Sequence, residues 1–236
     1  MPLLNEFHQP VGAPMPYWTR RATPSRVTLT GRLCEVTPLD AARHGPALFD
    51  AYQQAPDGRD WTYMMAGPFD TLESYQVYCE RIARMDDPLQ FAVIDLSTGK
   101  PVGTFALMRI DPANGVIEVG SVAFSPRMRR TALSTEAHYL LMCYVFEDLG
   151  YRRYEWKCDN FNAPSKNAAE RLGFRFEGVF RQAVVYRNRT RDTAWFSMLD
   201  DEWPARRAAF EAWLTPDNFD TAGQQLRTLQ AIRDIS

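Results

Sequence analysis

A chain of 236 residues with 45% hydrophobic residues is long enough for one large domain or two small ones and can bury a sizeable core. The formal net charge of -2 and the pI near 6.0 argue against bulk nucleic-acid binding, which usually shows as a strongly basic domain. Four widely spaced cysteines without a C-x-x-C pair predict neither a zinc site nor a disulfide framework, so we expect reduced thiols in a cytoplasmic protein that uses no metal.

The N-terminal residues 1–31 are predicted to form an extended arm. Five prolines in this stretch prevent a continuous helix or an interior strand. Phe7, Tyr17 and Trp18 are expected to dock either on the body of the protein or on a second subunit, because exposed aromatic side chains are costly. Neither the arm nor the rest of the chain has the roughly 18 consecutive apolar residues that cross a bilayer, so we expect no membrane partner.

The first half of the body is predicted to contain a short strand, two helices and three strands in meander order. Asp40 is a suitable N-cap for the first helix, and residues 70–73 resemble an N-terminal capping pattern for the second. The loop at residues 55–69 contains Pro and Gly but also Trp61 and Tyr63, as loops that line pockets often do. The predicted ranges are Arg32–Leu39 (strand), Ala41–Tyr52 and Thr71–Met85 (helices), and Leu89–Asp95, Val102–Ile110 and Val116–Phe124 (strands).

The stretch Val116–Phe146 changes its hydrophobic period halfway. Residues 116–124 are nearly all apolar or small, which favours a buried strand, whereas apolar residues after Ser134 recur at the three- and four-residue spacing of a helix. Three arginines and no acid lie between them, at residues 127–130. A helix N-terminus has unpaired N–H groups and the positive end of the helix dipole, so a basic loop that enters it predicts an anion site. We predict that the anion is a pyrophosphate.

The second half of the chain is predicted to alternate between strands and helices. A strand after residue 150 follows a helix and is therefore expected to run parallel to residues 116–124. Gly173 is expected to end the next helix. The predicted ranges are Tyr151–Cys158 (strand), Asn162–Gly173 (helix), Phe174–Tyr186 and Thr193–Met198 (strands joined by a turn at Arg187–Thr190), Asp200–Leu214 (helix) and a short helix within Thr215–Ser236.

Short motifs follow this order of elements. Residues 127–132, Arg-Met-Arg-Arg-Thr-Ala, lie in the register of a Q/R-x-x-G-x-G/A signature, with Arg130 where the first glycine is expected. Supporting matches are Ile117–Gly120, Ser134–Ala137, Asn162-x-x-Ser165, Arg171–Phe174, Arg191–Ser197 and Asp201–Pro204. Together they resemble the GNAT superfamily of acyl-CoA-dependent N-acetyltransferases, and within it the RimJ/RimL type of ribosomal-protein N-acetyltransferase.

The resemblance implies an α+β fold with α/β/α layers. Its central sheet would be mixed, mostly antiparallel, and splayed at the parallel pair of strands. The acetyltransferase domain would span residues 32–199, between the arm at residues 1–31 and a C-terminal helical extension at residues 200–236 that packs on the domain.

The resemblance also implies acetyl-CoA as a co-substrate and no metal. Backbone N–H groups of residues 129–133 would hold the pyrophosphate, with the side chains of Arg127 and Arg129 adding positive charge. The Arg130 side chain would reach the 3′-phosphate rather than the pyrophosphate. The strand edge at residues 121–124 would pair with the pantetheine, and Asn162 would bind its amide. A solvated basic turn is the open alternative for the arginines, and a helix cap is the open alternative for Asn162. The predicted cofactor-binding residues are Ser121, Val122, Ala123, Phe124, Arg127, Arg129, Arg130, Thr131, Ala132, Leu133, Ser134, Asn162 and Ser165.

Two residues are predicted to be catalytic. Glu118 is the only acid in its strand, and it would act as general base either directly or through a water. Burial among apolar neighbours would raise its pKa toward the range useful for that role. An ion pair with an arginine such as Arg109 is the open alternative. Ser165 matches the serine that supports the departing thiolate in the RimJ/RimL branch, with a helix N-cap as the alternative. Many relatives use a tyrosine as acid at a position that is Ala169 here.

The sequence therefore predicts transfer of an acetyl group from acetyl-CoA to a primary amine, either a protein N-terminal α-amine or a small-molecule amine. A non-catalytic acyl-CoA-binding module is the second hypothesis, suggested by Arg130 and Ala169. The negative net charge disfavours a third, nucleic-acid binding through the arginine loop. The protein is expected to be a monomer or a homodimer, with the arm and the C-terminal segment each covering a dimer contact or wrapping one subunit.

Overall fold

An eight-stranded mixed sheet forms the centre of the structure, a computed structural model in which residues 3–235 are described. The strands of this sheet are β3 (Leu29–Thr30), β4 (Cys34–Pro38), β5 (Leu89–Asp95), β6 (Lys100–Asp111), β7 (Val116–Phe124), β8 (Arg153–Asp159), β9 (Arg175–Tyr186) and β10 (Arg189–Leu199). Their order is β3-β4-β5-β6-β7-β8-β10-β9. Among the described strands only β7 and β8 pair in parallel. The predicted α+β class with a mixed, mostly antiparallel sheet is confirmed.

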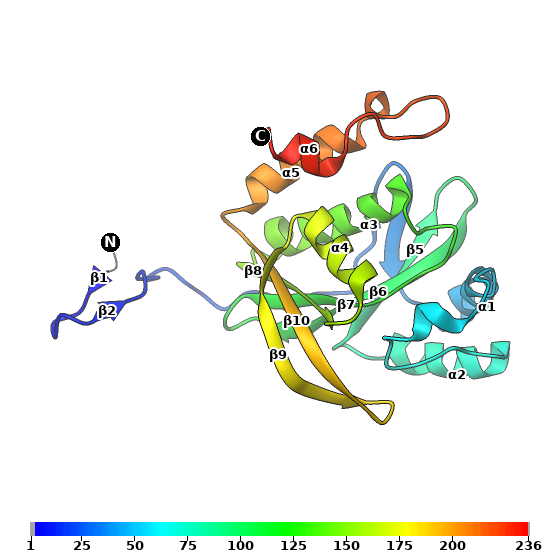
Figure 1. Cartoon of the computed structure of the whole chain (residues 1–236), viewed down its shortest axis with the longest axis horizontal. Coiled ribbons are helices and arrows are strands. Elements are labelled where there is room, and N and C mark those ends of the chain that lie inside the picture. Colours follow the sequence, from blue (N-terminus) through cyan, green and yellow to red (C-terminus); the bar gives the residue numbers. More distant parts are fainter. Residues whose placement is uncertain (1–2, 236) are drawn as a thin grey trace.

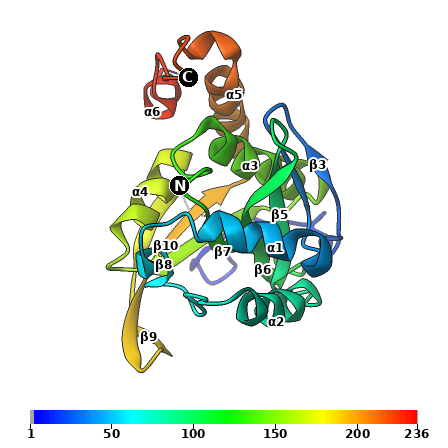
Figure 2. The ribbon, with the colours of Figure 1, turned by 90° about the vertical axis from the view of Figure 1, so that its right-hand side faces the viewer.

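Helices cover both faces of the sheet. They are α1 (Ala41–Tyr52), α2 (Leu72–Ala83), α3 (Ala132–Cys143), α4 (Ala163–Leu172), α5 (Trp203–Leu214) and α6 (Leu229–Arg233), with short 3-10 helices η1 (Gly58–Trp61) and η3 (Pro216–Asn218). Helices α1 and α2 lie on one face, α3 and α4 on the other, and α5 and α6 lie beyond α3 and α4 (Figures 1 and 2). Within residues 3–235, the helices are all too short or too polar to span a bilayer.

Local signals in the sequence predicted several helix and strand boundaries correctly. The predicted ranges of α1, β5 and β7 are those found in the structure. Asp40 accepts hydrogen bonds from the N–H groups of Ala42 and Arg43, so it caps α1 as predicted. Gly173 ends α4 in the left-handed conformation at φ 97°, which a residue without a Cβ adopts at little cost.

The hairpin β9–β10 is longer than predicted. Thr193 was the expected start of its second strand, but β10 begins at Arg189 and pairs with Tyr186. Arg187 and Asn188 both have positive φ, at 49° and 59°, as the two-residue type I′ turn of a hairpin requires. Because this turn uses only two residues, the strands continue to its edge.

The helix after β7 starts earlier than predicted and changes form at its end. Thr131 rather than Ser134 marks its start, since the Thr131 side chain accepts a hydrogen bond from the Ser134 N–H. A π-helical turn, η2 (Tyr144–Asp148), follows α3 without a break. At the C-terminal end of the chain, α5 begins at Trp203 instead of Asp200.

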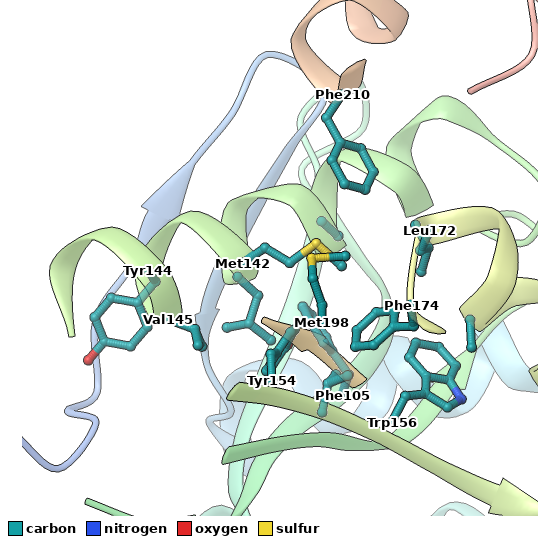
Figure 3. Packing of buried hydrophobic residues seen from close by; sticks show 14 of the residues in the cluster. Phe105, Met142, Tyr144, Val145, Tyr154, Trp156, Leu172, Phe174, Met198 and Phe210 are labelled. Atoms are coloured by element: carbon teal, nitrogen blue, oxygen red, sulfur yellow. The ribbon is translucent and has the colours of Figure 1, made fainter. Parts of the chain in front are cut away.

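Two hydrophobic cores flank the sheet. The larger lies between the sheet and helices α3, α4 and α5, and it extends from Phe105, Trp156 and Phe174 near the sheet to Phe210 on α5 (Figure 3). The smaller packs α1 and α2 against the other face. In the larger core, Trp203 of α5 stacks on Phe146 with ring centroids 5.1 Å apart, which fixes the C-terminal helices on the main body.

The N-terminal arm contains short strands that sequence patterns did not predict. Strands β1 (Leu3–Leu4) and β2 (Pro10–Val11) form a hairpin of their own, and β3 joins the edge of the main sheet. Trp18 docks on the body, since its Nε1 donates to Ala113 O at 2.8 Å. Phe7 and Tyr17 are exposed and do not dock on the body of this chain, and their docking on a second subunit stays a prediction.

Candidate active site

The sheet opens between β7 and β8. The two strands pair only from Val116–Arg153 to Val119–Trp156, so the predicted splay at the parallel pair is present. Residues 120–124 continue to pair with β6 but have no partner on the β8 side. A bulge in this half of β7 includes Ser121, whose φ is 51°. The splay thus leaves a partly exposed strand edge at Ser121–Phe124, the residues predicted to meet the pantetheine.

A basic loop connects this edge to α3. Arg127, Arg129 and Arg130 are exposed, whereas Met128 is fully buried and anchors the loop. Arg130 has a φ of 61°, so it adopts the left-handed conformation that the glycine of the signature would adopt more easily. The left-handed backbone conformation of Arg130 therefore explains why the signature has a glycine at this position.

The N–H groups near the start of α3 are available to an anion with one exception. The Arg129 N–H donates to Ser125 O at 3.1 Å, which corrects its predicted place among the pyrophosphate donors. In the part of the chain that the structure describes, the N–H groups of Arg130 and Thr131 have no hydrogen-bond acceptor. Ala132 and Leu133 lie in the first helical turn, whose N–H groups lack partners within a helix.

The loop before α2 reaches across to the basic loop. Asp60 in η1 forms an ion pair with Arg129. The same segment is held from two other sides: Tyr63 Oη donates to Phe161 O at 3.2 Å, and Arg187 donates to Trp61 O at 2.9 Å. Segment 58–63 therefore bridges the open end of the β7–β8 splay, in contact with the loop after β8 and with the β9–β10 turn.

Glu118 lies on the sheet face opposite the larger core, in a cluster of charged residues. The residue is 4% exposed, and Oε2 lies 3.0 Å from Arg109 Nε and 2.9 Å from Lys157 Nζ. Lys157 also contacts Glu155, at 2.6 Å, and its Nζ lies 3.8 Å from the centre of a Trp195 ring. Burial raises the pKa of Glu118 above its ordinary value, and the two nearby cations oppose that shift. The alternative of an ion pair with Arg109 is confirmed as a contact, and the pKa shift has the direction that a general base needs.

Ser165 lies at the start of α4, but it does not cap the helix. Asn162 is the N-cap, because its Oδ1 accepts from the Ser165 N–H at 3.2 Å. The Ser165 hydroxyl oxygen accepts from Trp156 Nε1 at 3.0 Å. Trp156 occupies one lone pair of this oxygen, and the hydroxyl also hydrogen-bonds the Cys158 side chain, so its proton must turn away from Cys158 to reach another acceptor. Ala169, where many relatives carry a tyrosine, is fully buried.

The imidazole ring of His138 packs among aromatic side chains beside the splay and serves no polar function there. Its ring is between 5.3 and 5.5 Å from the rings of Phe105, Phe124 and Trp156. Burial lowers its pKa to about 3, with Arg171 adding to the shift. His138 is therefore neutral at physiological pH and supports the packing of the strands on either side of the opening.

A pocket of ≈ 230 Å³ lies beside α1, between that helix and the loop before α2. Tyr52 connects it to the splay, because its ring lines the pocket and its hydroxyl donates to Ala123 O at 3.0 Å. Phe49, Trp61, Phe69 and Tyr75 are the other aromatic residues in its wall, and Asp57 and Asp70 also line the pocket. Electron-rich rings with nearby carboxylates suit a cationic group.

Several residues of the site were not predicted from the sequence. Asp60 and Tyr52 lie more than 60 residues before the segments they contact, and no local motif marks them. The position of Lys157 beside Glu118 is a consequence of the parallel register. Because Glu118 pairs with Glu155, the next residue of β8 on the same face, Lys157, lies close to Glu118. Within residues 3–235, no three His, Cys, Asp or Glu side chains gather where they could share a metal ion.

Comparison with known proteins gives one consistent result. A family model described as an acetyltransferase (GNAT) domain matches residues 35–175. The crystal structure of a GCN5-related N-acetyltransferase from Brucella melitensis is 51% identical to this chain, with a TM-score of 0.92. That match covers 93% of this chain and 100% of the other.

Two curated bacterial proteins match shorter segments. The uncharacterized N-acetyltransferase YnaD of Bacillus subtilis (strain 168) is 28% identical over 86 residues, and the uncharacterized N-acetyltransferase p20 of Bacillus licheniformis is 30% identical over 114 residues. These segments cover 36% and 48% of this chain. They span 50% and 64% of the two relatives' own lengths.

Proposed function

Because the chain belongs to the GNAT family of acetyltransferases, we propose that it transfers the acetyl group of acetyl-CoA to a primary amine. The observation that carries the proposal is the divergence of β7 and β8 after four residue pairs, directly beside a basic loop at a helix N-terminus. A strand edge and an anion site are thus arranged end to end, as a long ligand with a diphosphate at one end requires. The matched segment includes both features.

The residues that would hold acetyl-CoA form a continuous path. Unpaired N–H groups at residues 130–133 and the arginine side chains suit the pyrophosphate. The open edge of Ser121–Phe124 offers backbone groups to the pantetheine amides, and Asn162 caps α4 shortly after β8, the strand on the other side of the splay. Asn162 Oδ1 is engaged with Ser165, so its side-chain NH₂ is the group left for an amide oxygen.

Acetyl-CoA supplies an activated acetyl group as a thioester. In our proposal Glu118 accepts a proton from the incoming amine, so that the amine nitrogen can form a bond to the acetyl carbon. Ser165 donates a hydrogen bond to the thiolate as the carbon–sulfur bond breaks, which is possible because Trp156 donates to its oxygen. Lys157 stays close to Glu155 when Glu118 becomes neutral, so the cluster keeps a paired charge throughout.

The finer proposal concerns the acceptor. The motifs of the RimJ/RimL type support a protein N-terminal α-amine, whereas the aromatic pocket next to Tyr52 also suits a small cationic amine. We propose a primary amine that enters from the α1 side of the sheet. A non-catalytic acyl-CoA-binding module is the second candidate, favoured by the buried Ala169 in place of an acid.

A CoA-release assay tests both candidates. The purified chain is incubated with acetyl-CoA and a panel of amines: peptides with different first residues, small polyamines and amine antibiotics. We expect thiol release above the rate without acceptor for at least one class. Thermal stabilisation by acetyl-CoA with no release across the whole panel would support the binding module instead.

The Asp60–Arg129 ion pair leads to a prediction about affinity. Arg129 must leave Asp60, or share its charge, when a pyrophosphate binds. Replacing Asp60 with asparagine removes the competing carboxylate and is expected to lower the Kd of acetyl-CoA about 1.5-fold to fivefold, the range of a partly exposed ion pair. Isothermal titration calorimetry measures this Kd directly.

Asp57→Asn is the control for this experiment. Asp57 lies in the same loop, but its partner is Arg59, and it does not contact Arg129. The control should leave the Kd unchanged. Weaker binding by Asp60→Asn would contradict the competition and would mean that Asp60 orders Arg129 for the ligand.

A further inference from the structure

The N-terminal arm exposes an unusual number of large apolar side chains. Tyr17 is 93% exposed and Phe7 is 71% exposed. Four more exposed apolar residues lie within the same short segment: Leu3, Leu4, Val11 and Met15. Such a concentration in one projecting element indicates a surface that is buried against another molecule.

The arm is a formed structure and not a loose tail. Asn5 closes the β1–β2 hairpin, since its N–H donates to Gln9 O at 3.0 Å and its Oδ1 accepts from the Gln9 N–H at 2.9 Å. The hairpin lies away from the body (Figure 1). Its base is firmly held, because Trp18 Nε1 donates to Ala113 O and the Arg21 N–H donates to Pro112 O at 2.9 Å. An ordered apolar hairpin on a fixed base is ready to dock without further folding.

Strand β9 provides a second exposed apolar surface. It is the last strand in the sheet order, so its outer edge pairs with no strand in residues 3–235. Phe176, Val179, Phe180 and Val185 of this strand are all exposed, with Val185 at 81%. A long apolar edge of this kind is usually covered in the functional protein, since unpaired N–H and C=O groups invite another strand.

We propose that the arm of one copy docks on β9 of a second copy, giving a symmetric dimer with two identical arm contacts. The occupant is a second copy because this one chain carries both unpartnered surfaces, and its own β1–β2 hairpin projects away from its own sheet (Figure 1). An exchange of this type is self-complementary and closes at two subunits.

The positions of the two surfaces fit this exchange. The arm leaves the body at the turn before Val116, the first residue of β7. The same end of the sheet contains Arg153 of β8, which pairs with Val116, and Leu199 of β10, which pairs with Arg153. Strand β9 begins at the same end of the sheet, since Arg175 pairs with Ser197. Residues 12–17 can span up to about 20 Å when extended, so the hairpin reaches beyond the edge of its own subunit.

The charges of the two surfaces are complementary. Glu6 is the only charged residue between residues 3 and 17. On β9, Arg175 and Arg181 are exposed, whereas the acid of the strand, Glu177, is already paired with Arg153. Residues 3–17, with a single negative charge, therefore meet a strand with two exposed arginines, of which Arg175 also helps to lower the pKa of Glu177.

Sedimentation equilibrium of the full chain and of two surface variants tests the proposal. The arm variant carries Leu4→Ser and Phe7→Ser, and the β9 variant carries Phe180→Ser and Val185→Ser. All four positions are exposed, so the fold should be retained, and circular dichroism verifies this. We expect a dimer for the full chain at micromolar concentration and at least a tenfold increase in the dimer Kd for each variant.

Mixing the two variants separates arm exchange from general stickiness. The arm variant keeps an intact β9 and the β9 variant keeps an intact arm, so together they can form one native contact, and we expect heterodimers with a Kd between those of the full chain and the single variants. Val77→Ser is the control, because Val77 is an exposed apolar residue on α2, outside both surfaces. A monomeric full chain, dimers that survive in the arm variant, or variants that fail to associate with each other would each overturn the proposal.

Discussion

Replacing Glu118 with glutamine is expected to lower turnover by about 100-fold to 10,000-fold while leaving the Kd of acetyl-CoA nearly unchanged. Glutamine keeps the size of the side chain but cannot accept a proton from the amine. Glu118 lies on the face of β7 away from the larger core, and the predicted acetyl-CoA contacts are further along the strand and in the basic loop. Steady-state kinetics and calorimetry on the same variant separate the two effects.

Glu155→Gln is the matched control for this substitution. Glu155 is the register partner of Glu118 on β8, is also buried, and contacts the same Lys157. If Glu118 is the base, the control keeps most of the turnover. Equal losses in the two variants would assign the effect to the charge balance around Lys157, and unchanged turnover in Glu118→Gln would remove Glu118 as base.

The pH dependence gives an independent check on the same residue. A base acts when it is deprotonated, and burial raises the pKa of Glu118 above its ordinary value. The kcat/KM of the wild type should therefore fall as the pH decreases through a value above about 4.3, the usual pKa of glutamate. This acidic limb should be absent from the profile of Glu118→Gln.

Replacing Glu136 with alanine is expected to reduce the free energy of unfolding by about 4 kcal/mol. The carboxylate of Glu136 is buried and accepts three backbone N–H groups, from Arg32 at 3.0 Å, Leu33 at 2.6 Å and Cys34 at 2.9 Å. Alanine leaves all three donors without an acceptor, the Cys34 N–H buried and the other two partly buried, and a buried donor without a partner costs about 1–3 kcal/mol. For a protein of this size, the change corresponds to a decrease in Tm of roughly 8–16 °C.

Thermal unfolding followed by circular dichroism measures this effect, and Glu170→Ala serves as the control. Glu170 is exposed on α4, so its loss should change the Tm by less than about 2 °C. A Tm of Glu136→Ala within the same small range would show that water replaces the carboxylate at the three N–H groups. In that case Glu136 would not be the residue that holds the β3–β4 turn on α3.

Local patterns in the sequence predicted most elements of the fold because caps, turns and hydrophobic periods act over a few residues. Asp40 and Gly173 marked helix ends correctly, and the apolar run of β7 marked a buried strand. Glu136 illustrates the limit of this reasoning. Its three donors lie 102 to 104 residues earlier in the chain, and no spacing rule connects residues that far apart.

The same limit applies to the candidate site. Glu118 and the basic loop are adjacent in the sequence and were predicted together, but their partners come from other elements. Lys157 depends on the register of a parallel pair, and Asp60 belongs to a loop whose path is set by contacts with Phe161 and the β9–β10 turn. Only the assembled fold brings these residues to Glu118 and Arg129.

Arg130 makes the basic loop ordered before any ligand arrives. Its φ of 61° costs about 1 kcal/mol for a residue with a Cβ, but the loop holds this shape through the buried Met128 and the hydrogen bond from Thr131 Oγ1 to Met128 O at 2.6 Å. A glycine would adopt the same φ without strain and would also give the loop more conformations to lose on binding. Arginine here therefore exchanges a small local strain for a preorganised anion site, and the family signature at this position specifies a backbone conformation more than a residue type.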